Sequence, residues 1–219
     1  MVVRENFENK LLELQAKMAE MGELAVTSLE KAFSAFKTQD IELALKVIEE
    51  DTVIDQLEID INQFAVWLMA KEQPVARDLR KVIGSLKISS EIERIADFAV
   101  NIAKSTIIIG NATTVVKITN LEQMKEISIN MLQKALQSFF EENIVLAKEV
   151  GDLDDKVDQY NGETFKMITN HLKEHPDETD QLVQYLFVNR YLERTADHIT
   201  NIAESAAYLI KGRIYDLNP

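Results

Sequence analysis

An internal repeat constrains the fold of this 219-residue chain more than any other feature of its sequence. The segment 29–32 (L-x-K-A) returns 103 residues later, and the segment 93–101 (E-R-x-A-D-x-x-x-N) returns 100 residues later. A sequence repeat of this kind encodes a repeated structural unit. We therefore expect two copies of one unit, in residues 1–112 and 117–215.

Each copy is predicted to contain three long helices. In the first copy, apolar residues recur at steps of three and four over residues 7–36, which is typical of a helix packed in a bundle. Asp40 is the expected N-cap of a second helix over 41–71. Pro74 ends that helix, because the residue before a proline is driven out of the helical region. A third helix is predicted over 75–109.

The second copy has the same kinds of helix start and stop signals. Thr119 and Glu122 form a predicted capping box, residues 141–143 break the chain, Pro176 separates the fifth helix from the sixth, and the sixth ends near Lys211. Only six glycines and three prolines occur in the whole chain, which favours long helices over a sheet. The expected fold is all-α, with two tandem repeated three-helix bundles and six long helices.

The composition argues against several classes of function. A net charge of −13 without a dense Lys/Arg cluster argues against nucleic-acid binding. The absence of cysteine excludes disulfides and thiolate metal sites. The first six residues lack the apolar run typical of a secretory signal, and no stretch reaches the roughly 20 apolar residues of a membrane span. We therefore expect a soluble, cytoplasmic protein.

Acidic residues form stripes on neighbouring helices. Asp51 and Asp55 are spaced by four, as are Glu93, Asp97 and Asn101. Four residues turn an α-helix by a full turn plus only about 40°, so each set lies along one face. Paired antiparallel helices are predicted to bring the two stripes together. The second copy has the same stripes, at Asp154, Asp158, Glu193, Asp197 and Asn201.

Such clustered carboxylates require protons, arginines or a metal cation. Oxygen ligands without thiolates suit hard cations such as Mg²⁺, Mn²⁺, Ca²⁺ or iron. Arg94 and Arg194 stand one residue from the stripes and can neutralise only part of each cluster. The alternative is a solvated charged face paired to Lys and Arg. The run 64–69, which includes Trp67, is expected in the core. We expect the three histidines at the surface or at its boundary with the core, namely His171, His175 and His198.

The duplicated motif resembles that of the PhoU family, regulators of bacterial phosphate uptake. Both copies of E-R-x-x-D-x-x-x-N follow a D-x-x-x-D pair and a proline turn, and the likeness covers essentially the whole chain. It implies two three-helix bundles, a homodimer, and clusters of iron or zinc, with Mg or Mn as further candidates. The implied ligands are Asp51, Asp55, Glu93, Asp97, Asp154, Asp158, Glu193 and Asp197, with Asn101 and Asn201 in support.

Two departures from the family pattern accompany this resemblance. Ala96 and Ala196 stand where the family commonly has glycine, so a methyl group there would tighten the approach of the neighbouring helix. Asn161 stands where the repeat places Glu58 in the first copy, so the second cluster carries less negative charge.

The resemblance implies an adaptor without a catalytic step. Such a protein would restrain the phosphate ABC transporter through its ATPase subunit, act on a sensor histidine kinase, and approach the membrane only through these partners. A carboxylate-bridged di-metal enzyme is one alternative, but its typical E-x-x-H is absent, since Ile168, Leu172 and Thr195 stand three residues before the histidines. A purely structural helical protein, which would bind no metal, is the other.

Overall fold

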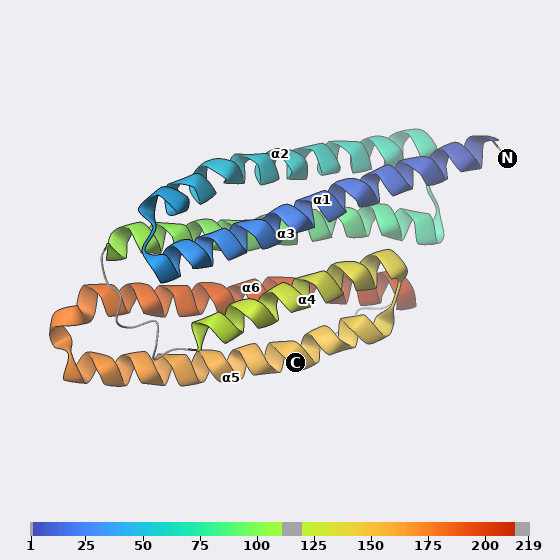
Figure 1. Cartoon of the computed structure of the whole chain (residues 1–219). Helices are drawn as coiled ribbons and strands as arrows, with labels where there is room; N and C mark the ends of the chain where they lie inside the picture. The colour runs from blue at the N-terminus through green and yellow to red at the C-terminus, as the bar shows by residue number, and fades with distance from the viewer. Residues whose placement is uncertain (1, 111–119, 213–219) are drawn as a thin grey trace.

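The structure is a computed structural model that describes residues 2–110 and 120–212, with side chains from residue 7 onward. It confirms the all-α architecture and the two tandem helical repeats (Figure 1). In chain order the elements are α1 (Val2–Thr38), α2 (Ile41–Glu72), α3 (Ala76–Ile109), α4 (Leu121–Glu141), α5 (Ile144–Glu174), the short 3₁₀ helix η2 (Pro176–Glu178) and α6 (Thr179–Lys211).

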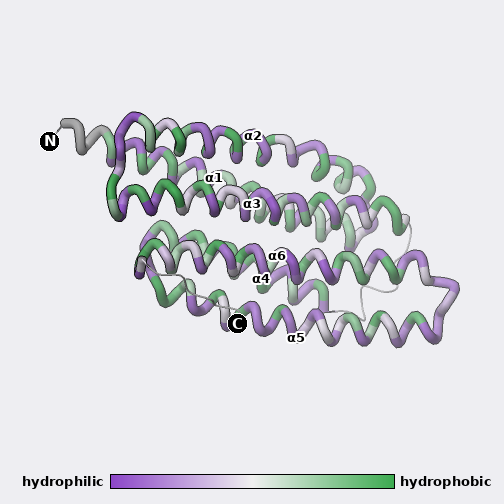
Figure 2. Tube along the Cα trace, turned by 180° about the vertical axis from the view of Figure 1, so that it is seen from behind, coloured by the Kyte–Doolittle hydropathy of each residue, from purple (hydrophilic) through white to green (hydrophobic). Residues whose placement is uncertain are grey.

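The six helices form two layers of three. Helices α1, α2 and α3 make one bundle, and α4, α5 and α6 make the other (Figure 1). Helix α3 lies along α6, so the third helix of each repeat forms most of the contact between the bundles. The tube in Figure 2 shows apolar and polar residues alternating along every helix, as expected for helices with one buried face. The buried apolar side chains form one continuous core.

Local sequence explains where α2 begins and ends. The Asp40 carboxylate accepts a hydrogen bond of 2.9 Å from the backbone N–H of Leu43, which confirms the predicted cap. Gln73 adopts a left-handed conformation with φ of 48°, and Pro74 follows it. Helix α3 then begins at Ala76, one residue later than predicted. Of the predicted capping box before α4, Thr119 lies outside the described residues.

The predicted core position of the run 64–69 is wrong for two of its residues. Ala65 and Leu68 are fully buried, whereas Val66 is 56% and Trp67 40% exposed. A helix turns by about 100° per residue, so six consecutive apolar residues cannot all face one core. The Trp67 ring instead stacks on Phe64 and lies 4.5 Å from the Lys10 ammonium.

The contact between α3 and α6 is symmetric in position but not in chemistry. Glu91 of α3 accepts a hydrogen bond from the His198 ring of α6 at 2.6 Å. The repeat equivalents of these residues are Tyr191 and Phe98, whose rings stack with centroids 6.1 Å apart. One residue pair therefore occurs twice across the contact, once as a polar pair and once as an aromatic pair.

Glycine brings α4 close to the first bundle. A Cβ atom on Gly84 of α3 would stand 2.9 Å from Cε2 of Phe139 in α4, closer than real Cβ contacts. The Phe139 ring is buried and packed in the core. The helix approach at this position therefore depends on the missing side chain of Gly84.

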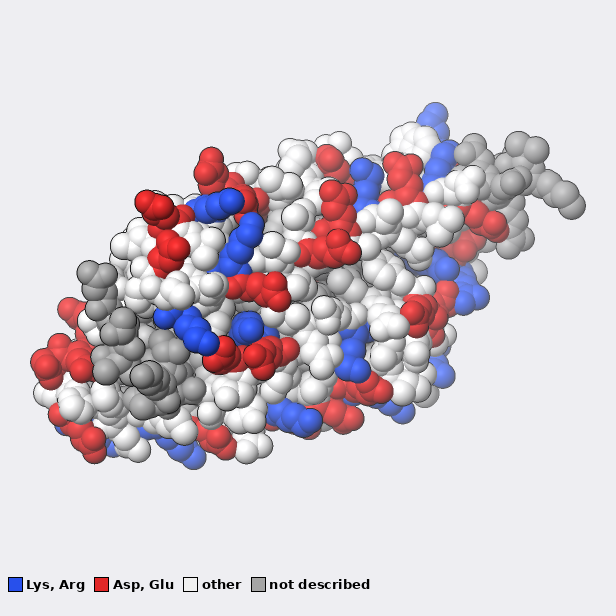
Figure 3. Space-filling view, viewed as in Figure 1, with Lys and Arg blue, Asp and Glu red and all other residues white. Residues whose placement is uncertain are grey.

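The described surface carries mixed charge. On the face shown in Figure 3, basic side chains lie beside acidic ones. Ion pairs on the described surface include Lys31–Glu50 at 2.6 Å and Lys37–Glu122 at 2.7 Å. No helix in the described part of the chain is long and apolar enough to cross a membrane.

Candidate metal centres

The first acidic cluster lies between α2 and α3. Burial, followed by the negative charges of Asp55 and Asp97, raises the pKa of the Asp51 carboxyl to about 6. Burial and the charge of Asp97 raise the pKa of Glu93 to about 7, with smaller contributions from Glu58 and Asp55. These mutual effects show that the two stripes face each other, as predicted from their spacing.

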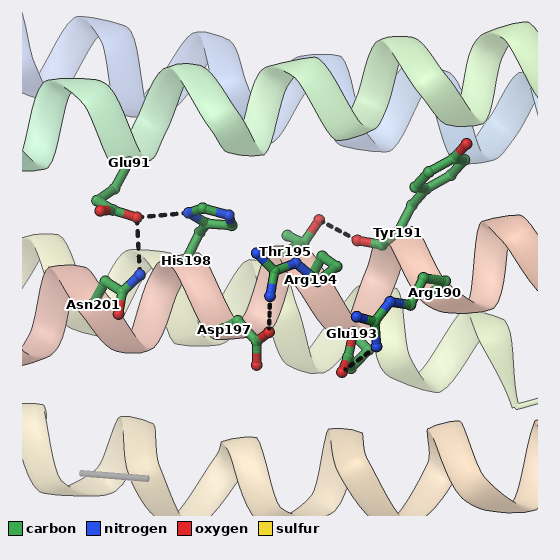
Figure 4. Close-up of polar contacts among 9 residues, drawn as sticks. All are labelled: Glu91, Arg190, Tyr191, Glu193, Arg194, Thr195, Asp197, His198 and Asn201. Atoms are coloured by element: carbon green, nitrogen blue, oxygen red, sulfur yellow. Dashed lines mark hydrogen bonds and ion pairs between the residues drawn. The ribbon is translucent and has the colours of Figure 1, made fainter. Parts of the chain in front are cut away.

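The second cluster occupies the equivalent place between α5 and α6. Asp154 is 3% exposed, and burial together with the charges of Asp158 and Asp197 raises its pKa to about 7. The pKa of Asp158 and that of Glu193 are also raised, first by burial and then by Asp197. Figure 4 shows Glu193 and Asp197 on the side of α6 that faces α5.

Arginines neutralise part of each cluster. Arg94 donates a hydrogen bond of 3.0 Å to Asp97. In the second cluster Arg194 donates to Asp197 at 2.9 Å, and Arg190 donates to Glu193 at 3.0 Å. These pairs all lie within α3 or within α6, so the charges contributed by α2 and α5 receive no ion pair from them.

Two buried oxygen atoms in the clusters have no hydrogen-bond partner among the described residues. One is Oδ1 of Asp51 in the first cluster, and the other is Oε2 of Glu193 in the second. A buried carboxylate oxygen without a donor is costly unless a proton or a cation satisfies it. The donor chemistry therefore fits a metal ion that prefers oxygen ligands.

The carboxylates have not converged to a compact ligand set. Among the described residues, one group brings three ligand atoms within 4.8 Å of one another, and it consists of His171, His175 and Glu178 rather than any stripe residues. Mutual repulsion keeps like charges apart, and the arginines hold Asp97 and Asp197 against their own helices. Metal binding in the stripes would require side-chain rotations toward a shared cation.

The two asparagines of the predicted site do not behave alike. Asn101 is partly buried on α3, one turn beyond Asp97. Asn201 is exposed and donates a hydrogen bond of 3.1 Å to Glu91 of the other bundle, as Figure 4 shows. Its amide is therefore directed to the contact between α3 and α6. Asn161, which replaces an acid in the repeat, accepts hydrogen bonds from Asn189 of α6.

Sequence reasoning missed three features of the structure. Glu91 was not predicted because its repeat equivalent is tyrosine. Burial alone would raise the pKa of Glu91, but hydrogen bonds from His198 and Asn201 outweigh it and lower that pKa. Arg190 was not predicted because its equivalent in the first repeat is Ser90. The pairing of His171 with His175 is the third feature, and their spacing by four residues is the signal that could have indicated it.

The fold and the duplicated clusters define a class of protein, two-repeat helical bundles with one carboxylate cluster between paired helices in each repeat. The PhoU domain matches residues 18–106 and 121–206. The chain belongs to the PhoU family.

Individual relatives cover nearly the whole chain. A phosphate-specific transport system accessory protein PhoU homolog from Clostridium acetobutylicum is 34% identical over 218 residues, which are 99% of this chain and 100% of the relative. The crystal structure of PhoU from Pseudomonas aeruginosa matches with a TM-score of 0.87 at 29% identity, covering 94% of this chain and 100% of that one. The phosphate transport system regulatory protein PhoU from Streptococcus pneumoniae matches with a TM-score of 0.87 at 30% identity, covering 96% and 99%.

Proposed function

We propose that this protein is a cytoplasmic, metal-binding adaptor that regulates phosphate uptake and phosphate-responsive signalling. It docks on the ATPase subunit of the phosphate ABC transporter and on the neighbouring sensor histidine kinase, and it carries out no catalytic step. The observation that carries this proposal is the pair of equivalent carboxylate clusters, each holding a buried oxygen that receives no hydrogen bond from the described residues.

The clusters support metal binding on grounds of charge. In each, carboxylates from two helices face one another, and the arginines pair only with the third helix of the repeat. A bound cation neutralises the remaining charge and joins α2 to α3, or α5 to α6. Iron or zinc is proposed from the family resemblance, and Mg²⁺ or Mn²⁺ also suits an all-oxygen site.

Support for the partners comes from the relatives and from the surface. The relative from Clostridium acetobutylicum is named an accessory protein of the phosphate-specific transport system. On this chain, α2 exposes large apolar side chains to solvent, which is typical of a surface that binds another protein. They include Leu45, Ile59, Val66 and Trp67.

The test removes one charge from each cluster. The double substitution Asp97→Ala and Asp197→Ala is expected to reduce bound metal at least about tenfold, because each residue faces carboxylates of the paired helix. Metal content is measured by mass spectrometry on protein purified without chelators or nickel. Affinity for the purified transporter ATPase and for the kinase is measured by surface plasmon resonance, and is expected to fall in the same variant.

The matched control removes the same charge from the same two helices, away from the clusters. Asp78→Ala with Asp180→Ala lies in the first turns of α3 and α6 and is expected to keep both metal and partner affinity. A parent protein without metal would refute the metal site. A parent protein that binds neither partner would refute the adaptor role. Unchanged partner affinity after metal loss would show that partner binding does not require the metal.

A further inference from the structure

We propose that His171, His175 and Glu178 form a zinc site at the turn between α5 and α6, distinct from the two carboxylate clusters. The three side chains offer ligand atoms that all lie within 4.8 Å of one another. Two imidazoles and one carboxylate are an established ligand set for Zn²⁺, with water in the fourth position. This inference does not depend on the proposed regulatory function.

The geometry of the three side chains is close to that of a chelate. Nε2 of His171 lies 3.0 Å from Oε2 of Glu178. The rings of His171 and His175 stack with their centroids 4.3 Å apart. Ligand atoms about 2.0–2.1 Å from a tetrahedral zinc lie a little over 3 Å from each other, so small rotations complete the site.

The local fold explains why these residues meet. His171 lies in the last turn of α5, and His175 is the C-cap residue, whose backbone N–H donates a 2.8 Å hydrogen bond to the His171 carbonyl. The two residues therefore stand one turn apart, and their rings stack. Pro176 then starts η2, and this single turn carries Glu178 back to His171. The ligands thus come from both sides of a tight turn.

The site is accessible to a cation. The side chains of His171 and Glu178 are 23% and 29% exposed, and His175 lies on the surface. Imidazole nitrogen favours Zn²⁺ over Mg²⁺ and Ca²⁺, which prefer oxygen ligands. The two histidine ligands therefore favour Zn²⁺ over Mg²⁺ and Ca²⁺ more strongly than an all-oxygen cluster does.

The first repeat provides an internal comparison. Its equivalent turn, aligned through Pro74 and Pro176, has Met69, Gln73 and Ala76 where the second has the two histidines and the glutamate. The first repeat therefore joins its second and third helices without any of the three ligands, through a turn of different backbone geometry, with φ of 48° at Gln73 and 49° at Ala76.

The site is far from the nearest carboxylate cluster. His171 follows Asp158 by 13 residues on α5. At about 1.5 Å per residue, this spacing separates their backbones by about 20 Å. Occupancy of one site can therefore be measured independently of the other.

The test uses the imidazole signals of the full chain, which has three histidines. Chelator-treated, ¹⁵N-labelled protein is titrated with zinc chloride and followed by long-range ¹H–¹⁵N correlation spectra. The ring signals of His171 and His175 are expected to shift together and to saturate at one zinc per site. The third signal, from His198, lies at the contact with Glu91 and serves as the reference for a histidine outside the proposed site.

Matched variants assign the ligands. Glu178→Gln is expected to lower zinc affinity at the histidines at least about tenfold, while Glu174→Gln, one residue before His175, leaves it unchanged. His175→Ala should remove the shift of the His171 ring. Circular dichroism melting checks that each variant is folded. The proposal is overturned if excess zinc leaves both ring signals in place, or if the two glutamate variants bind zinc equally.

Discussion

Raising the pH from about 5 to about 8 is expected to lower the free energy of unfolding of the metal-free protein by about 2–4 kcal/mol. The pKa values of Glu93 and Asp154 are raised to about 7 and that of Asp51 to about 6. Between their ordinary values and these raised values, the native state holds protons that the unfolded chain has released. Stability contributed by these protons is therefore complete at low pH and lost as pH rises through about 7.

Urea unfolding in the presence of a chelator, followed by circular dichroism across this pH range, measures the effect. Glu93→Gln with Asp154→Asn should flatten the pH dependence, because the amides cannot ionise. Glu49→Gln with Asp152→Asn, which changes two exposed carboxyl groups, should leave it in place. Saturating metal should reduce the loss at high pH, since a cation stabilises the ionised form. Stability of the metal-free parent that rises from pH 5 to pH 8 would contradict the predicted burial of these carboxyls.

Replacing Gly84 with valine is expected to lower the free energy of unfolding by about 2–3 kcal/mol. The first added carbon alone would stand 2.9 Å from the Phe139 ring. That ring is itself buried in the core and has little space to move, so α4 must shift away from α3. Gains in helix propensity from removing a glycine, up to about 1 kcal/mol, are too small to offset the clash.

Gly162→Val is the matched control. Gly162 also lies inside a long helix, but a Cβ atom there would meet nothing within 4 Å. Its substitution should change stability by no more than about 0.5 kcal/mol. Urea unfolding of both variants gives the comparison. Equal stability of the two would mean that α3 and α4 do not approach each other as closely as the structure shows.

Much of the fold followed from the sequence because the repeat and the helix punctuation are local signals. Asp40 and Pro74 fixed the ends of α2 within a residue. The carboxylate stripes faced each other as expected, because residues spaced by four share a helix face whatever surrounds them. The raised pKa values then followed from the antiparallel pairing of α2 with α3 and of α5 with α6.

Much of what sequence reasoning missed depends on contacts that reach beyond a single helix. The repeat predicts site residues that match between the two copies, whereas Glu91 differs from its equivalent, Tyr191, and bonds His198 of the other bundle. The amide of Asn201 was expected beside the carboxylates but reaches the other bundle. Glu178 joins the histidines only because the chain reverses at Pro176, a geometry that the spacing of residues on one helix does not reveal.

The unequal residue pairs at the contact between α3 and α6 also decide which helices can pair. Two α3 helices packed in the same way would place the Glu91 carboxylate against Phe98 twice, and two α6 helices would place Tyr191 against His198 twice. Only α3 with α6 gives both the hydrogen-bonded pair and the stacked rings. The divergence of the two copies therefore favours pairing of a first repeat with a second repeat and disfavours pairing of like repeats from two chains.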